Sequence, residues 1–123
     1  MKALIERDGR FLAVKQQFNG GDYWDLPGGR MEHGETPHQT LTREVREETK
    51  LDVVVGRPAG VWWFFRQDGN QIVCMTFFCT AQGTVDIGKN PADEDIKEFR
   101  WVTKKEFLQL AADESLKELV ASI

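Results

Sequence analysis

The clearest pattern in the chain is a series of short stretches in which apolar and polar residues alternate, with the two-residue period of a half-buried β-strand. Turn signals separate several of these stretches. Asp8-Gly9 follows the first, and Gln67-Asp68-Gly69-Asn70 lies between two of the later ones. Both are typical of β-hairpins. We therefore predict strands at residues 2–6, 11–15, 23–26, 51–55, 61–66, 71–80 and 98–102.

Three helices are predicted from their start signals. Thr36 can be an N-cap with Gln39 closing a capping box, and Pro37 suits the first helical position. This predicts a helix over residues 37–49. Two further helices are predicted from the capping box Thr103/Glu106, running to about Ala111, and from Asp113, ending near Ala121. Strands precede, interrupt and follow the helices, which predicts an α/β (α+β) fold with a mixed sheet covered by helices.

Length and composition predict one ordinary globular domain over residues 1–123. Apolar residues make up 41% and charged residues 29%, and the formal net charge is −4. The lack of a basic excess argues against a stable nucleic-acid complex and against electrostatic membrane binding. No apolar run approaches the ~20 residues of a membrane span. A polyanionic ligand would need a local basic patch or a bridging cation.

The two cysteines predict a reducing environment rather than a disulfide. Cys74 and Cys79 lie five positions apart in an apolar stretch. In a strand an odd separation puts them on opposite faces, so they should not pair with each other. Their spacing also differs from the C-x-x-C of zinc and redox motifs. We therefore expect buried thiols and a cytoplasmic protein.

One face of the helix over 37–49 carries an unusual set of acids. At 100° per residue, Glu44, Glu47 and Glu48 share an arc of about 100°, beside the apolar stripe of Leu41 and Val45. Carboxylates grouped in this way suit hard cations such as Mg²⁺ or Mn²⁺. A solvated surface helix, neutralised by its arginines, explains the same pattern, so this face alone does not settle the chemistry.

The wider spacing separates these readings. Glu35 follows Gly29 after five residues, Arg43-Glu44 follow after seven more, and Glu47-Glu48 come after Val45 and one free position. This resembles the Nudix box, G-x5-E-x7-R-E-U-x-E-E-x-G-U, where U is a bulky aliphatic residue. Lys50 stands where the family has its last glycine, and it enters the left-handed conformation expected there at a cost of ~1 kcal/mol. The segments 24–29 and 99–102 also look like the family.

The resemblance implies a Nudix-type mixed β-sheet sandwiched between helices, and metal-dependent hydrolysis of a pyrophosphate bond in a nucleoside diphosphate linked to another group. In the family pattern Mg²⁺ or Mn²⁺ is the cofactor. Nucleoside triphosphates, ADP-ribose and nucleotide sugars all remain open as substrates. A different class also stays open, a Nudix-fold module that senses a nucleotide without cleaving it. The complete acid set argues against that alternative.

The resemblance also implies roles for single residues. The metal ligands are expected to be Glu44 and Glu48, with Glu47 beside them, and one of these would orient or deprotonate the attacking water. Arg43 would brace the glutamates, and Glu35 would fix the loop against the helix or take part in catalysis. The remaining expected metal contacts are a backbone carbonyl of Gly28 or Gly29 and one acid among Asp93, Glu94 and Asp95, of which Glu94 is preferred.

Four residues outside the box are candidates for binding the substrate. Lys15 and Arg66 are expected to reach phosphates. Residues 62–65 are aromatic and alternate across a strand, so one pair faces the core while the other can contact a base or a second subunit. We assign Trp62 and Phe64 to the substrate. Exposed aromatic residues in this stretch would favour a homodimer.

Overall fold

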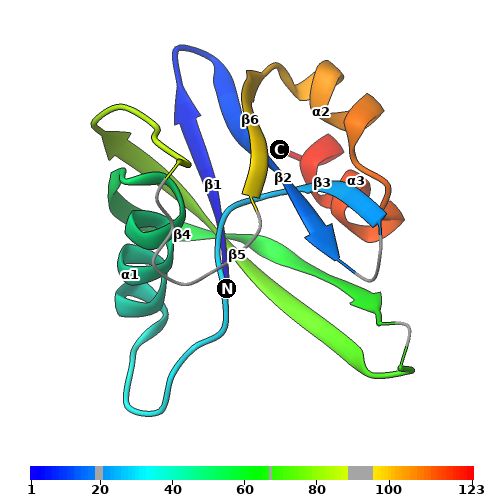
Figure 1. Cartoon of the computed structure of the whole chain (residues 1–123). Helices are drawn as coiled ribbons and strands as arrows, with labels where there is room; N and C mark the ends of the chain where they lie inside the picture. Colours follow the sequence, from blue (N-terminus) through cyan, green and yellow to red (C-terminus); the bar gives the residue numbers. More distant parts are fainter. Residues whose placement is uncertain (19–20, 67, 89–95) are drawn as a thin grey trace.

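The computed structural model describes residues 1–18, 21–66, 68–88 and 96–123. Figure 1 shows a sheet with helices on both sides. In the described residues, the strands are β1 (Lys2–Arg7), β2 (Arg10–Phe18), β3 (Gly21–Asp25), β4 (Asp52–Phe65), β5 (Gln71–Gln82) and β6 (Ile96–Val102). The helices are α1 (Pro37–Thr49), α2 (Lys104–Leu110) and α3 (Glu114–Ala121).

The strand order β3-β2-β1-β5-β4, with β6 paired to β2, makes a mixed sheet of six strands within the described ranges. β1 and β5 are parallel, and the other pairs are antiparallel. β1 pairs with β2 only at Glu6↔Phe11 and Arg7↔Arg10. Beyond that point the two strands separate, and the start of β1 pairs with the chain around Gly28 instead. This separation lets the segment after β3 approach the centre of the sheet.

Two apolar clusters hold the layers together, one on each face of the sheet. On one face α1 contributes Leu41 and Val45 to a cluster that also contains buried residues of β1 and β5. On the other face Phe107 of α2 and Leu116 of α3 pack in a second cluster. The predicted mixed sheet between helices is therefore confirmed (Figure 1).

The largest difference from the predicted elements is in β4. Two strands, 51–55 and 61–66, were expected, but Asp52–Phe65 is one strand that pairs with β5 along its length. The pairing register shifts between Val55 and Pro58 and again between Pro58 and Gly60. Irregularities of this kind let a strand pass through residues that pair poorly, such as proline, without ending. Helix α3 packs at this place, since a Cβ on Gly60 would collide with Leu119.

Local signals were more reliable. Asp8 and Gly9 both have positive φ (53° and 76°), as a tight hairpin turn requires. Each of the caps predicted at Thr36, Thr103 and Asp113 is present, and both capping boxes are complete. Lys50 takes the left-handed conformation at the end of α1, with φ 66°. The departure from the family's glycine therefore leaves the helix end where the motif predicts it.

The cysteines lie where the alternation predicted. Both are free and buried, Cys74 in the cluster beside α2 and α3 and Cys79 in the cluster beside α1. Burial raises the pKa of Cys79 to about 12, so this thiol stays protonated at neutral pH. Among the helices that the structure describes, none is both long and apolar enough to cross a membrane.

Candidate functional site

Gly28 and Gly29 lie directly against the acidic face of α1. The Met1 nitrogen donates to the Gly29 carbonyl oxygen (2.9 Å), and the Gly29 N–H donates back to the Met1 carbonyl oxygen (3.0 Å). These bonds fix the segment beside the first residues of the chain. A Cβ on Gly29 would collide with the carboxyl group of Glu44, and one on Gly28 would collide with the Met1 backbone. Only glycine allows so close an approach.

The carboxylates of Glu44 and Glu48 are buried beneath this segment. Glu44 is 6% exposed and Glu48 is 0% exposed. The Gly28 N–H donates to Glu48 Oε1 (2.8 Å), and Gln16 Nε2 donates to Glu48 Oε2 (3.2 Å). Burying carboxylates is costly, so native proteins do it where the charge is compensated and the position is needed. The acids therefore lie deeper than the edge position that the helical wheel suggested.

Arg43 connects the acids of the loop and the helix. Its guanidinium donates to both oxygens of Glu35, at 2.8 and 2.9 Å, and to Glu44 Oε1 at 2.7 Å. It also donates to the Arg30 carbonyl oxygen (3.1 Å). The hydrogen bond from Arg43 is the main reason that the pKa of Glu35 falls to about 2. Arg43 thus makes the bracing contacts predicted for it, and Glu35 ties the loop to the helix.

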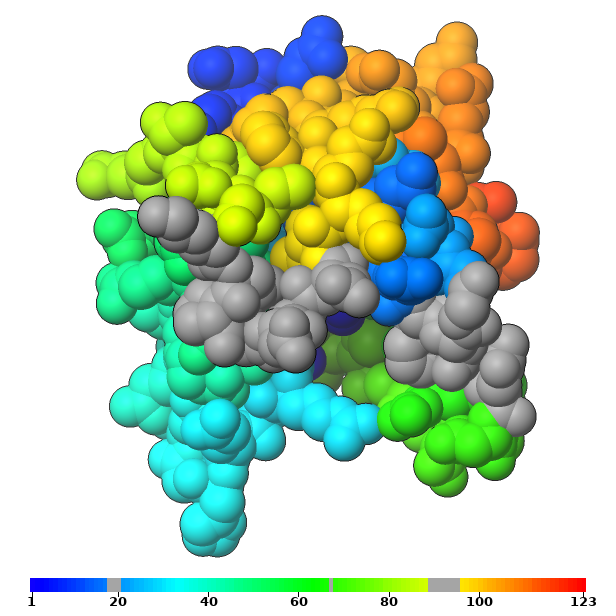
Figure 2. All heavy atoms as spheres, viewed as in Figure 1, coloured from blue at the N-terminus to red at the C-terminus, as the bar shows by residue number. Residues whose placement is uncertain are grey.

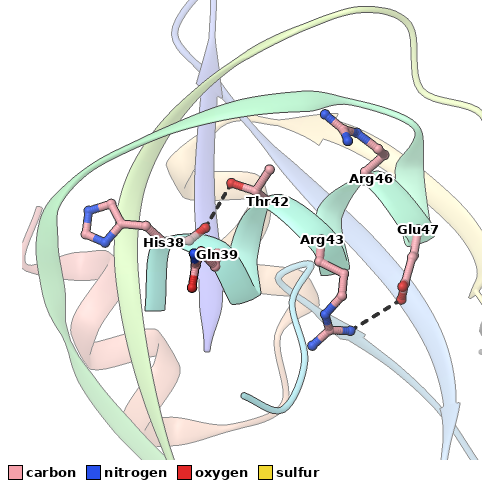
Figure 3. Close-up of a pocket in the computed structure, with 6 residues that line it drawn as sticks. All are labelled: His38, Gln39, Thr42, Arg43, Arg46 and Glu47. Carbon is pink, nitrogen blue, oxygen red and sulfur yellow. Dashed lines mark hydrogen bonds and ion pairs between the residues drawn. The ribbon is translucent and has the colours of Figure 1, made fainter. Parts of the chain in front are cut away.

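The outer side of α1 has a shallow hollow lined by residues of a single helix (Figure 3). Arg43 and Glu47 point toward each other there, with their nearest charged atoms 3.6 Å apart. Arg46 points away from them and pairs with Asp52 (2.7 Å). Glu47 is therefore more accessible than the other two predicted metal ligands, at the rim of the acidic face.

A second, larger hollow of about 920 Å³ opens beside Glu44 and the two glycines. Figure 2 shows the molecule hollowed between the cyan segment that follows β3 and the green β4–β5 ribbon. One wall comes from β2 and β3, including Gln16, Gln17 and Tyr23, and the other from β4 and β5, including Phe64 and Ile72. This hollow therefore has apolar side chains on one wall and lies beside the acidic face of α1 at Gly29.

Three cationic side chains line the same hollow: Lys2, Arg30 and Arg66. Lys2 forms a buried ion pair with Asp25 (2.7 Å). Although burial by itself lowers the pKa of Lys2, the charge and hydrogen bond of Asp25 outweigh it and hold that pKa above its ordinary value. Burial also raises the pKa of Tyr23 to about 12, so its hydroxyl is a neutral donor. The cations of this hollow lie close to acids, since Lys2 pairs with Asp25 and Arg66 lies 3.7 Å from Asp68.

The predicted substrate residues divide into two groups. Phe64 and Arg66 line the hollow, and Arg66 lies 3.7 Å from Asp68. Trp62 does not: it is 2% exposed, packs in the core and donates its ring N–H to Thr76 (3.0 Å). The expected base contact of Trp62 is therefore corrected to a packing role. The alternation correctly put Trp62 and Phe64 on one face of the strand, and that face packs on the core.

Lys15 lies in β2 opposite Trp24 of β3 and Glu98 of β6. Gln16 follows it and faces α1, so alternation turns Lys15 to the opposite face of the sheet. Its predicted phosphate contact is thus not favoured by this position. The candidate acids Asp93, Glu94 and Asp95 lie outside the described residues.

The donor set suits a divalent cation. Glu44 and Glu48 lie one helical turn apart, and the Gly29 backbone is so close to Glu44 that no side chain fits between them. Carboxylate and carbonyl oxygens are the ligands that Mg²⁺ and Mn²⁺ prefer. Within the described residues no group of three or more His, Cys, Asp or Glu is already arranged around a cation position. Arg43 instead lies among these acids and neutralises them. A cation would have to share or exchange these contacts.

Sequence reasoning missed Lys2, Gln16, Tyr23, Asp25 and Arg30. Their partners are distant in the chain: Lys2 and Asp25 are 23 positions apart, and Gln16 and Glu48 are 32 apart. No spacing rule connects such pairs. The available signal was weak: Gln16 lies in the polar run Lys15-Gln16-Gln17, and Lys2 opens a strand that is otherwise mostly apolar.

Comparisons with known proteins identify the family of the chain. A profile described as "NUDIX domain" matches residues 2–123. A MutT-like protein of Streptomyces ambofaciens is 39% identical over 83 residues, which is 68% of this chain and 51% of that protein. The nucleoside triphosphatase NudI of Enterobacter sp. (strain 638) is 30% identical, over 91% of this chain and 86% of that protein.

Solved structures share the fold. The crystal structure of a MutT protein from Methanosarcina mazei Go1 superposes with a TM-score of 0.81 at 24% identity, over 98% of this chain and 88% of that one. The chain spans about half the length of the Streptomyces relative.

Proposed function

Because the chain belongs to the Nudix domain family, we propose that it is a metal-dependent hydrolase of a pyrophosphate bond in a nucleoside diphosphate linked to another group. The single observation that carries this proposal is the burial of Glu44 and Glu48 against Gly28 and Gly29. Burying carboxylates costs free energy that hydrogen bonds at best offset, so their burial here favours a ligand-holding role. The surface-helix explanation of the acids is disfavoured, since a solvated helix would have left them exposed.

Each residue of the site has a task in such a reaction. When bound, Mg²⁺ or Mn²⁺ supplies charge stabilisation to the phosphates and lowers the pKa of a coordinated water. Glu44, Glu48 and Glu47 would hold it, together with a backbone carbonyl of Gly28 or Gly29. The Gly29 oxygen already accepts from Met1, but a carbonyl oxygen has a second lone pair. Arg43 and Glu35 keep the carboxylates and the loop in place.

The hollow supplies the substrate contacts. Arg30 and Arg66 line the hollow and would meet phosphate oxygens, for which a guanidinium offers paired donors. Phe64 and Tyr23, on opposite walls, offer ring faces to a nucleobase. The similarity to NudI, described as a nucleoside triphosphatase, makes nucleoside triphosphates the first substrates to test. ADP-ribose and nucleotide sugars are the next.

The test is a panel assay of purified protein with nucleoside triphosphates, ADP-ribose and nucleotide sugars, in Mg²⁺, in Mn²⁺ and in excess chelator. We expect metal-dependent turnover of at least one compound, faster at alkaline pH where the attacking water is more easily deprotonated. Full activity in chelator would refute the metal-dependent mechanism.

The alternative is a sensing module that binds a nucleotide without cleaving it. Its signature would be a ligand-dependent rise in melting temperature with no product released over long incubation. The complete set Arg43, Glu44, Glu47 and Glu48 favours the enzyme, because binding alone does not need a site for activated water.

Two further proposals concern the environment of the protein. We propose that the outer face of the β4–β5 ribbon supports a homodimer, because it exposes apolar side chains. These side chains are Val61, Trp63, Phe65, Val73 and Met75. Light scattering of the parent and of Phe65→Ser would test it, with a monomeric parent as the contradicting result. The free buried cysteines support a reducing compartment, the cytoplasm.

A further inference from the structure

Glu48 is held by a chain of hydrogen bonds that lies outside the Nudix box. Gln16 Nε2 donates to Glu48 Oε2 at 3.2 Å. The Tyr23 hydroxyl donates to Gln16 Oε1 at 2.9 Å. Both Gln16 and Tyr23 line the hollow, and Glu48 is completely buried behind them. These two hydrogen bonds therefore connect the 920 Å³ hollow to a predicted metal ligand.

The orientation of the Gln16 amide follows from the chemistry of its neighbours. An ionised carboxylate only accepts hydrogen bonds, so the amide must turn its NH₂ toward Glu48. Its oxygen then faces Tyr23, whose protonated hydroxyl can donate. Gln16 and Tyr23 are directly opposite each other in the β2–β3 pair, so their side chains lie on the same face of the sheet. The sheet register thus brings the two side chains together.

We propose that Gln16 and Tyr23 are positioning residues that hold the Glu48 carboxylate in its metal-binding orientation. Gln16 acts directly on Glu48, and Tyr23 acts through Gln16. The Gly28 N–H donates to one carboxylate oxygen and Gln16 donates to the other, so loss of Gln16 removes the hydrogen bond that fixes Oε2. This inference rests on the proposed function, because it assigns Glu48 to the metal.

The two hydrogen bonds, from Tyr23 to Gln16 and from Gln16 to Glu48, are called the relay below. They give the polar side chain at this point of β2 a role. Gln16 is flanked by Val14 on the same face, and Val14 is fully buried. An apolar side chain at position 16 could not make the hydrogen bond that Gln16 donates to Glu48. The amide is needed because Glu48 is an acid. Removing a residue that hydrogen-bonds to a metal ligand typically lowers metal affinity or activity by about 10–100-fold.

The first variant is Gln16→Met, which keeps an unbranched side chain of similar size and removes both hydrogen-bonding groups. Mn²⁺ binding is measured by titration calorimetry without substrate, and kcat and KM are measured separately. We expect Mn²⁺ affinity or kcat to fall roughly 10–100-fold, with a much smaller change in KM. The matched control is Gln109→Met on the exposed surface of α2, which should bind Mn²⁺ and turn over like the parent.

The second variant is Tyr23→Phe, which keeps the ring and removes only the hydroxyl. We expect a loss in the same direction but smaller, roughly five-fold, as for one neutral hydrogen bond. In the Gln16→Met background, Tyr23→Phe should cost less than it does in the parent, because the part of its effect that acts through the amide is already lost. Metal-free melting temperatures show whether any variant has lost its fold. A third variant is Gln16→Asn. It retains the amide, but its shorter side chain cannot reach Glu48, so it should behave like Gln16→Met.

The outcomes separate the relay from the proposed function. A parent that binds Mn²⁺ and hydrolyses a nucleotide, with Gln16→Met unchanged in both, overturns the relay alone. Equal losses from Tyr23→Phe in both backgrounds overturn the role of Tyr23 through Gln16. A parent that neither binds Mn²⁺ nor turns over any nucleotide overturns the proposed function and the relay together.

Discussion

Helices α1 and α2 begin in the same way but differ in what they bury. Each has a threonine N-cap and a complete capping box, Thr36 with Gln39 and Thr103 with Glu106. The buried side chain of α2 is the apolar Phe107. Helix α1 buries the acids Glu44 and Glu48 beside its apolar residues. The same local start therefore serves a purely structural helix and one that carries the proposed site.

The difference comes from what packs against each helix. Helix α2 meets an apolar cluster, whereas Gly28 and Gly29 bring backbone against the acids of α1. A backbone N–H and an amide can satisfy a carboxylate that an apolar neighbour cannot. A helix with acids on its inner face is thus stable only where the rest of the fold supplies polar partners. Four experiments test that contrast, and the first should give the largest effect.

Glu48→Gln should abolish most activity, because it removes one of the charges that would hold the cation. Losing a few kcal/mol of transition-state stabilisation corresponds to a roughly 10²–10³-fold drop in kcat. Metal should also raise the melting temperature of the parent but not of the variant. The same substitution in α2, Glu106→Gln, is the control and should leave turnover intact. Similar turnover in Glu48→Gln and the parent would contradict the assignment.

Gly29→Ala tests the close approach of backbone to acid. The added methyl group meets the Glu44 carboxyl and must displace it, so we expect about 1–3 kcal/mol lower free energy of unfolding and weaker metal binding. Denaturant unfolding and calorimetry measure the two effects. Gly21→Ala is the control, because its added methyl meets nothing within 4 Å. Equal behaviour of the two variants would show that Glu44 is not confined by Gly29.

The Arg43–Glu35 contact beside α1 should also show in the response of the protein to acid. The pKa of Glu35 is about 2 in the folded protein, below its ordinary value of 4.5. A lowered folded pKa means that its stabilisation is present above pH 4.5 and is lost as the pH falls toward 2. Glu35→Gln should therefore flatten the fall in melting temperature over this window. Melting curves between pH 2 and 6 measure it, and an unchanged slope would speak against the Arg43–Glu35 contact.

The smallest expected effect concerns the feature that the helices share. Thr36→Ala and Thr103→Ala each remove a side-chain cap and should each lower the free energy of unfolding by about 1 kcal/mol. Denaturant unfolding of both variants is the measurement. A loss confined to one helix would mean that the two capping boxes are not equivalent, although their contacts are the same.

Much of the fold was predictable because its signals are local. Helix starts depend on groups three positions apart, and the hairpin at Asp8 depends on adjacent residues. The helical period of 100° per residue also put the three glutamates on one face of α1 correctly. It could not show that Glu48 is fully buried while Glu47 stays accessible, since that depends on what covers the helix. The unbroken β4 was missed for a similar reason: pairing with β5 keeps residues 56–60 in the strand despite Pro58.

The sequence by itself determined the capped helices, the acids on one face of α1 and the family to which the chain belongs. Only the tertiary structure decided which groups meet those acids. Gln16 reaches Glu48 across 32 positions, and Gly29 reaches Met1 across 28, through the separation of β1 from β2. Local contacts follow from the periods of helix and strand. Distant contacts depend on sheet register and packing, which no short stretch of sequence contains.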